Sequence, residues 1–289
     1  MNNQINWQEF RCRCSAISKL LTNGKEGQQI TEKQLEELKR LEDKEARTTK
    51  QEEEMSRLQA LKSNSGKVVL GATCIEYLME VYAWETEGMV SVTKESLDSM
   101  PLKKGKVGEI EAGALLSLVD GVLYQRHKER IFNDYLSGEI DFYVGESVYK
   151  ATNVTDTKNA FDYPGFLKKI NNGLENGQRE QLAGYGDITG AQDLFIANCL
   201  ISFTPDMVMD MEYKILRKVN AATTESPEFL ELWPKIEKSM NFDQIPPAQR
   251  VSKIKVEPFT SFEQQKVYDR VKYCREWLFK FHEQRQKLQ

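Results

Sequence analysis

Two short acidic segments hold the residues of this chain that are best suited to chemistry. The first is Gly138-Glu139-Ile140-Asp141, and the second is Asp156-Thr157-Lys158. Side chains alternate along a β-strand, so Asp156 and Lys158 are expected on one face and Thr157 on the other. Asp141, on a strand that pairs with this one through a short turn, would reach the same face. Two carboxylates beside an ammonium suit Mg²⁺ or Mn²⁺ and a phosphate group.

Two further groups of polar residues lie on helices predicted before and after this strand pair. Gly105-x-x-x-Glu109-x-x-Ala112 places an acid early on a helix predicted over 109–119. Gln181-x-x-x-Tyr185 places two polar side chains one turn apart, on one helix face. Glu111 is the alternative to Glu109 as the acidic residue of this helix that faces the strands. The two lie about 200° apart around a helix, so only one of them can face the strands.

The order of these groups along the chain resembles that of the PD-(D/E)xK nuclease superfamily. An acid on a helix (Glu109) and an acid on a strand (Asp141) are followed by Asp-x-Lys and then by Gln-x-x-x-Tyr. The Gln-x-x-x-Tyr helix marks the branch with lambda exonuclease, the YqaJ-type phage recombination nucleases and the RecB nuclease domain. Arg13-Cys14-Ser15 matches the N-terminal segment of its phage members. The resemblance extends from Cys14 to the C-terminal helix. Glu139-Ile140 stand before Asp141 in place of the superfamily's proline, which members of this branch commonly lack.

The resemblance implies a role for each acidic residue. Asp141 and Asp156 would bind the metal together with the backbone carbonyl of Thr157. Glu109 would complete a metal position, directly or through water. Lys158 would orient the attacking water and offset the charge that develops on the phosphate. Whether Lys158 also takes the proton is left open, since that requires a lowered pKa.

The implied activity is that of a Mg²⁺- or Mn²⁺-dependent DNA exonuclease that acts on duplex ends in phage-type recombination or repair. Gln181 and Tyr185 would position the phosphate or the terminal nucleotide, although packing against the sheet is the alternative for Tyr185. Relatives of the lambda type form closed rings, so a homo-oligomer such as a ring trimer is expected, with a single-strand annealing protein as partner. An endonuclease on the same site and a catalytically inactive DNA-binding scaffold are the alternatives.

The composition is that of an ordinary globular protein, with 40% hydrophobic and 29% charged residues among 289. No apolar run approaches the roughly 20 residues of a membrane helix, and the first ten residues lack the apolar core of a signal peptide. We therefore expect an intracellular protein, in the host cytoplasm for a phage product. The net charge of −4 argues against a DNA-coating protein but not against a nuclease, whose site needs acids. Local basic groups would then contact DNA: Lys103, Lys104 and Lys106; Arg126, Lys128 and Arg130; Lys168 and Lys169.

Histidine and cysteine usage gives no sign of a zinc site. The two histidines, His127 and His282, are too few and too far apart to build one. Five cysteines fit a reducing compartment. Some related nucleases carry an iron–sulfur cluster on cysteines that follow the catalytic core, but here only Cys274 lies there. Buried or free thiols are the preferred interpretation.

The elements that must position these residues predict a mixed α/β (α+β) fold, with a small central sheet flanked by helices. Residues 1–100 would form a helical region and residues 101–289 a restriction-endonuclease-like core that ends in a C-terminal helix. A charged helical segment over 31–62, capped by Thr31 and Gln34, could alternatively serve a coiled-coil adaptor. Helices are predicted over 7–21, 31–62 in two parts or broken, 70–84, 109–119, 163–185 with a break near Gly177, 206–218 and from Thr260 onward. Strands are predicted over 135–144, 154–158, 194–203 and 250–256, with a short helix as the alternative for 194–203. A turn is predicted at 63–66 and a flexible segment at 103–106.

Overall fold

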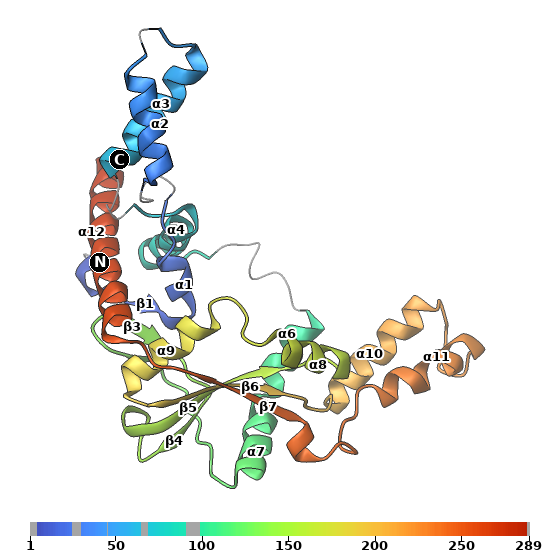
Figure 1. The fold of residues 1–289 in the computed structure, drawn as a ribbon. Coiled ribbons are helices and arrows are strands. Elements are labelled where there is room, and N and C mark those ends of the chain that lie inside the picture. The colour runs from blue at the N-terminus through green and yellow to red at the C-terminus, as the bar shows by residue number, and fades with distance from the viewer. Residues whose placement is uncertain (1–4, 25–29, 45, 65–68, 91–98, 288–289) are drawn as a thin grey trace. The chain divides into compact units, whose positions relative to one another are not determined.

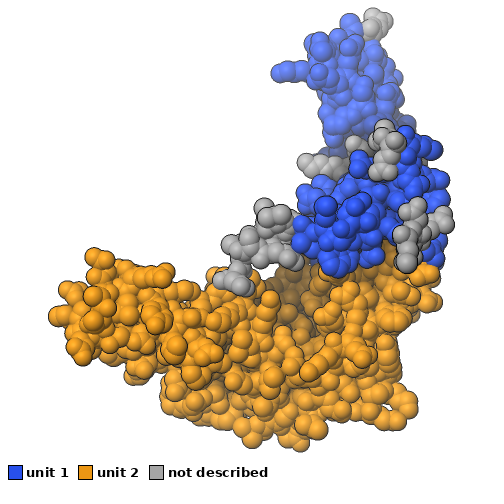
Figure 2. All heavy atoms as spheres, turned by 180° about the vertical axis from the view of Figure 1, so that it is seen from behind, with its two compact units in different colours: residues 1–8, 18–90, 270–289 blue, residues 9–17, 91–269 orange. Residues whose placement is uncertain are grey.

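The computed structural model describes residues 5–24, 30–44, 46–64, 69–90 and 99–287. These form two compact units, which Figure 2 shows in different colours. Unit 1 comprises Met1–Gln8, Ser18–Val90 and Arg270–Gln289, and unit 2 comprises Glu9–Ile17 and Ser91–Asp269. The predicted cut near residue 100 differs from this grouping, because Arg270–Gln289 belong with the N-terminal helices. All the residues singled out for metal and phosphate chemistry belong to unit 2.

Unit 1 is built from helices. The longest are α2 (Glu32–Glu42), α3 (Thr49–Asn64), α4 (Ala72–Glu87) and the later part of α12 (Ser261–Gln286). The predicted capping box at Thr31 and Gln34 is confirmed, and the charged segment is two helices packed through Leu38, Leu41 and Leu58. The turn predicted at 63–66 lies largely outside the described residues. Among the described helices, none is long and apolar enough to cross a membrane.

The prediction of a helix over 7–21 is wrong for most of this segment. Short 3-10 turns at Trp7–Glu9 (η1) and Cys14–Ala16 (η2) flank the two-residue strand β1 (Cys12–Arg13), and only α1 (Ile17–Leu20) is α-helical. Strand β1 pairs in parallel with β3 (Leu136–Gly138), which pairs antiparallel with β2 (Ile131–Phe132). The partner of β1 lies more than a hundred residues away, so local periodicity cannot reveal this pairing.

The main sheet of unit 2 has the strand order β4-β5-β6-β7 (Figure 1). Its strands are β4 (Phe142–Gly145), β5 (Ala151–Asn159), β6 (Asp193–Cys199) and β7 (Val251–Val256). Strand β5 is antiparallel to β4 and parallel to β6, and β7 is antiparallel to β6. The segment predicted as one strand over 135–144 is therefore two strands, β3 and β4, in different sheets. The expected mixed α/β class is confirmed.

Helices cover both faces of this sheet. Helix α7 (Glu109–Asp120) packs Leu115 and Leu116 against Phe142 and Ala197 on one face. Helix α9 (Gln178–Thr189) contacts β5 and β6 from the other, where Gly186 lies against Leu194. Gly186 lies inside α9 and does not end it as predicted, and neither does Gly184. The helix ends at Gly190, whose φ of +80° is readily adopted by glycine.

The remaining helices of unit 2 flank the sheet's edges and ends. They are α6 (Met100–Val107), α8 (Tyr163–Asn172), α10 (Pro205–Lys218) and α11 (Pro227–Lys238), with 3-10 turns η4 (Val148–Lys150) and η5 (Pro247–Gln249). The break predicted near Gly177 is confirmed between α8 and α9. The prediction of a flexible segment at 103–106 is wrong, because these residues lie within α6. The Ser99 hydroxyl accepts the Leu102 N–H and caps that helix.

Lys104 is buried, although the sequence suggested a DNA contact. Only 2% of the residue is exposed, and its ammonium donates to the Phe161 carbonyl at 2.7 Å. The ammonium also lies 4.2 Å from the ring centroid of Phe203 and 5.1 Å from that of Phe242. Burial lowers the pKa of Lys104 to about 7, although Asp162 and Glu111 act to raise it. The prediction of a DNA contact at Lys104 is wrong.

This burial predicts that stability depends on pH. Between pH about 7 and the ordinary pKa of 10.5, the unfolded chain holds a proton on Lys104 that the folded chain largely lacks. The free energy of unfolding should therefore rise with pH across this window, by at most about 1.4 kcal/mol per pH unit from this group. Lys104→Met keeps the length of the side chain and should remove that contribution. Urea denaturation of both proteins across the window measures it, and identical pH slopes would contradict the lowered pKa.

Candidate active site

Asp141 lies immediately before β4, beside Thr157 of β5. Its Oδ2 accepts hydrogen bonds from the backbone N–H and the hydroxyl of Thr157, both at 2.7 Å. These two bonds hold the carboxylate where the β4–β5 pairing stops. The N–H and C=O of one strand residue point toward the same neighbouring strand. The Thr157 carbonyl is therefore directed toward the Asp141 side of β5.

Asp156 and Lys158 lie together on one face of β5. Asp156 is 3% exposed, and the Lys158 Nζ lies 2.5 Å from its Oδ2. This contact is a close ion pair without hydrogen-bond geometry, so Oδ2 has no hydrogen-bond partner among the described residues. Burial and the charge of Asp141 raise the pKa of Asp156 to about 6, against the opposing effect of Lys158. Two carboxylates thus lie close enough to repel each other.

Lys158 is held in its charged form. Burial by itself would lower its pKa, but the charges of Asp156, Asp141 and Glu175 outweigh burial and raise the pKa of Lys158 above its ordinary value. An ammonium that keeps its proton at neutral pH is a poor general base. The side chain is 28% exposed, so a ligand can reach it. The raised pKa of Lys158 favours orientation of water and charge compensation over proton abstraction.

Glu109 begins α7 and faces Asp141. Its side chain is 34% exposed and accepts a hydrogen bond from Arg126 at 2.6 Å. Burial and the charge of Asp141 raise the pKa of Glu109, while Arg126 acts in the opposite direction. Glu111 is exposed, and its charge acts on Lys104. The structure therefore favours Glu109 over Glu111 as the helix acid. It also adds Arg126, which the sequence suggested only as a DNA contact.

Gln181 and Tyr185 lie one turn apart on α9 and bond to each other. The Gln181 Nε2 donates to the Tyr185 hydroxyl at 2.9 Å. Tyr185 is 3% exposed, and burial followed by the charge of Asp156 raises its pKa, so the hydroxyl keeps its proton. Its ring lies against Gly138 at the end of β3. Tyr185 thus packs on the smaller sheet, and the charges of Asp156 and Asp141 act on its hydroxyl.

The contact between Tyr185 and Gly138 predicts a strong effect of one added methyl group. A Cβ on Gly138 would overlap the ring and lie 3.3 Å from Cys14 Sγ. Gly138→Ala should lower the free energy of unfolding by about 1–3 kcal/mol, because the packed ring has to shift. Gly105→Ala, whose Cβ meets open space within α6, is the control and should stabilise by about 0.5–1 kcal/mol. Urea denaturation compares them, and equal effects would argue against the contact.

The other side chains considered from the sequence lie outside this cluster. Among the described residues, all five cysteines are buried and none forms a disulfide. Several basic residues are held by carboxylates, in the pairs Lys103–Asp210, Arg130–Glu139 and Lys169–Glu175. The cluster of chemical interest is therefore Asp141, Asp156, Lys158, Glu109 and the Gln181–Tyr185 pair.

The donor set suits a hard divalent cation. Asp141 and Asp156 supply carboxylate oxygens, one of them buried without a hydrogen-bond partner in the described chain, and the Thr157 carbonyl is directed the same way. The Lys158 ammonium lies beside that buried oxygen, where positive charge is needed. Within the described residues, no three His, Cys, Asp or Glu side chains converge to hold an ion.

Comparison with solved structures finds the same architecture in exonucleases. A phage-related exonuclease from Haemophilus somnus 129PT matches with a TM-score of 0.56 and 16% identity over 96% of both chains. The alkaline exonuclease LHK-Exo from Laribacter hongkongensis matches with a TM-score of 0.52 and 10% identity over 98% of both chains. Its complex with dAMP gives the same TM-score over the whole of both chains. The chain has the fold of these exonucleases.

The exonuclease fold accounts for the arrangement of the cluster, but the evidence for its chemistry comes from the chain itself. No protein-family model and no curated protein matches the sequence. Identities of 10–16% establish a shared fold and do not transfer residue roles. The roles assigned to Glu109, Asp141, Asp156, Thr157 and Lys158 stay predictions, as do those of Gln181 and Tyr185.

Proposed function

We propose that the protein is a Mg²⁺- or Mn²⁺-dependent deoxyribonuclease that hydrolyses phosphodiester bonds from the ends of duplex DNA. The observation that carries this proposal is the convergence of Asp141 and Asp156 beside Lys158 within an exonuclease fold. Two carboxylates that repel each other raise the free energy of the folded protein unless a cation binds them. LHK-Exo is known in complex with dAMP, a deoxynucleotide, which supports DNA as the substrate class.

The acidic residues and Lys158 would carry the hydrolysis. Asp141, held by Thr157, and Asp156 would bind the cation together with the Thr157 carbonyl, and Glu109 would join directly or through water. When bound, Mg²⁺ or Mn²⁺ would lower the pKa of the attacking water, polarise the phosphoryl oxygen and stabilise the leaving 3′-oxygen. Protonated Lys158 would orient that water and offset the charge developing on the phosphate.

Three further side chains would position the substrate. The Tyr185 hydroxyl keeps its proton beside the carboxylates and can donate to a phosphate oxygen. Gln181 already bonds to that hydroxyl and would share the same phosphate or terminal nucleotide. Arg126 is bonded to Glu109, and its guanidinium can bind a phosphate through two parallel hydrogen bonds.

We propose further that the enzyme resects DNA ends during phage-type recombination or repair, in the cytoplasm of the host. The strand that remains would be passed to a single-strand annealing protein. A closed homo-oligomer such as a ring trimer would hold the enzyme on its substrate over many cycles. The resemblance to lambda exonuclease and its relatives motivates all three expectations. Light scattering during size-exclusion chromatography measures the oligomeric state directly.

An end-labelled linear duplex, with and without Mg²⁺, tests the activity. We expect mononucleotides or short products with Mg²⁺ or Mn²⁺ and an intact duplex in EDTA. A covalently closed circular duplex should stay intact, since it has no ends. Its cleavage would identify an endonuclease on the same site. DNA binding without any metal binding in calorimetry would identify a scaffold instead of an enzyme.

A further inference from the structure

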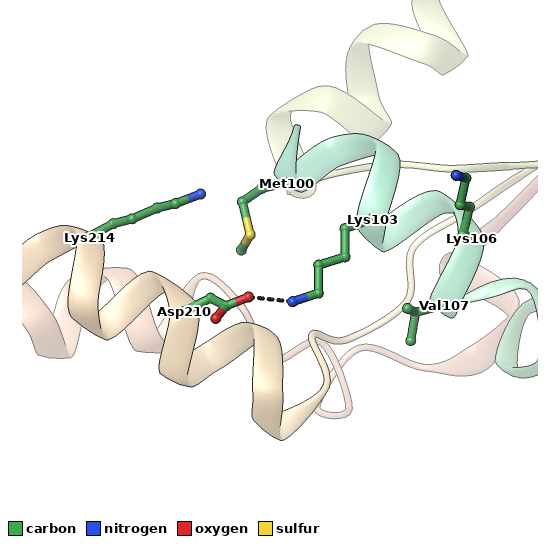
Figure 3. A pocket seen from close by; sticks show the side chains of 6 residues that line it. All are labelled: Met100, Lys103, Lys106, Val107, Asp210 and Lys214. Carbon is green, nitrogen blue, oxygen red and sulfur yellow. Dashed lines mark hydrogen bonds and ion pairs between the residues drawn. The ribbon is translucent and has the colours of Figure 1, made fainter. Parts of the chain in front are cut away.

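A cavity between α6 and α10 lies outside the cluster described above (Figure 3). Its volume is about 400 Å³, and it is lined by Met100, Lys103, Lys106, Val107, Asp210 and Lys214. Three lysines and one aspartate leave its lining with an excess of positive charge, in a chain whose net charge is −4. Such a local excess attracts a ligand of negative charge.

The lysines of this cavity differ in what they bind. Lys103 forms an ion pair with Asp210, which Figure 3 marks with a dashed line. Lys106 follows Lys103 by three residues on α6, and Lys214 follows Asp210 by four on α10, so each lies one turn further along its helix. Within the described chain, neither Lys106 nor Lys214 has an ion pair, and both are exposed. These two ammonium groups are therefore available to a ligand.

The cavity is connected to the candidate active site by backbone on two sides. Gly108 caps the end of α6 and the start of α7, so Lys106 precedes Glu109 by only three residues. Asn159, the residue after Lys158 on β5, donates its Nδ2 to the Gly105 carbonyl of α6 at 3.2 Å. Successive phosphates of one DNA strand are about 3.4 Å apart along the duplex axis. A strand bound at Asp141 and Asp156 therefore has further phosphates within reach of α6.

We infer that this cavity binds two backbone phosphates of DNA a few nucleotides from the bond that is cleaved, one at Lys106 and one at Lys214, which lie at its opposite ends (Figure 3). The inference rests on the proposed nuclease function and adds a second contact with the substrate. Among the described residues, no aromatic ring lines the cavity, so it offers no platform for stacking a base. Val107, which is exposed, presents apolar surface to a deoxyribose. The contact would follow the backbone without reading sequence.

The double variant Lys106→Ala/Lys214→Ala in the full chain tests this inference. Its affinity for a fluorescein-labelled linear duplex would be measured by anisotropy in EDTA, at a series of NaCl concentrations. Each lost lysine–phosphate contact reduces the slope of log affinity against log salt by about 1, so a reduction of about 2 is expected. The dissociation constant at physiological salt should rise about tenfold. With Mg²⁺, the weaker binding should raise KM for the same duplex.

Two matched variants control for charge and for folding. Lys235→Ala/Lys238→Ala removes the same charge from exposed positions on α11 that do not line the cavity. It should leave the salt slope close to that of the wild type. Lys106→Arg/Lys214→Arg keeps both charges and should preserve the wild-type slope. Thermal denaturation of all variants confirms that each is folded before its affinity is compared.

The outcomes separate this inference from the proposed function. A cavity variant whose salt slope and affinity match those of the α11 variant would overturn the inference, even if Mg²⁺-dependent cleavage is intact. An acidic protein ligand of the cavity would give that same result. A wild-type protein that neither binds nor cleaves DNA would overturn the nuclease proposal and this inference with it. A selective loss of slope in the cavity variant, restored by arginine, supports both.

Discussion

Asp156→Asn is expected to lower Mg²⁺-dependent DNA cleavage at least about 10³-fold while the protein stays folded, a loss of about 4 kcal/mol in transition-state stabilisation. The amide has nearly the shape of the carboxylate but no charge with which to bind a cation. In the wild type, Mg²⁺ at about 100 times its dissociation constant should add about 2.7 kcal/mol to the free energy of unfolding. This gain should disappear in the variant. Denaturation with and without Mg²⁺, beside the end-labelled duplex assay, measures both effects.

The same variant should not destabilise the metal-free protein, because the repulsion between Asp156 and Asp141 is removed. Asp193→Asn is a matched control, since Asp193 lies on β6 of the same sheet and forms an ion pair with Lys255 at 2.9 Å. About half of each of these side chains is exposed, so little depends on their charge. The control should keep wild-type cleavage and Mg²⁺-dependent stabilisation. Undiminished cleavage by Asp156→Asn would place the metal elsewhere in the protein.

Lys158→Ala is expected to separate metal binding from catalysis. The rate of single-turnover cleavage should fall about 10²–10³-fold, as when one group that stabilises developing charge is removed. Mg²⁺ should still bind, and more tightly, because the ammonium 2.5 Å from the Asp156 Oδ2 no longer competes for that oxygen. Calorimetric titration with Mg²⁺ and rapid-quench kinetics measure the two effects on one protein sample.

Lys169→Ala is the control for this second experiment. Lys169 has a similar side-chain exposure of 26%, and it forms an ion pair with Glu175, whose charge also reaches Lys158. Its loss should change neither Mg²⁺ affinity nor the rate of cleavage appreciably. A Lys158→Ala protein with an unchanged rate would show that this lysine only balances charge. Weakened Mg²⁺ binding would show that it supports the carboxylates structurally.

The parts of the site that follow from local periodicity could be predicted from the sequence. The two-residue period of a strand places Asp156 and Lys158 on one face, and the structure brings them into contact. The helical period likewise places Gln181 beside Tyr185. The antiparallel pairing of β4 with β5, which brings Asp141 near them, follows from two strand-like segments with a short turn between. These features depend on neighbours within about twenty residues.

The features that the sequence missed depend on distant contacts. Strand β1 forms only because β3 lies beside it, and its own two residues carry no strand signal. Lys104 looks like any surface lysine, since the rings around it come from Phe161, Phe203 and Phe242, far along the chain. Helix α6 is not predicted from the sequence, because its lysines and glycine indicate a flexible segment. Ser99 and Pro101 at its start were a usable signal. Helix α11 likewise has a serine at its N-cap and a proline directly after it, Ser226-Pro227.

The position of Asp156, Thr157 and Lys158 on an interior strand has a consequence for how binding energy is used. Beyond Thr155, β5 continues to pair with β6, and Asp141 ties down its other side through Thr157. The backbone that carries these groups is therefore ordered once, when the chain folds. Because these groups are already ordered, substrate binding does not have to offset a loss of their conformational entropy. Contacts made along the rest of the DNA can then serve to lower the barrier to cleavage.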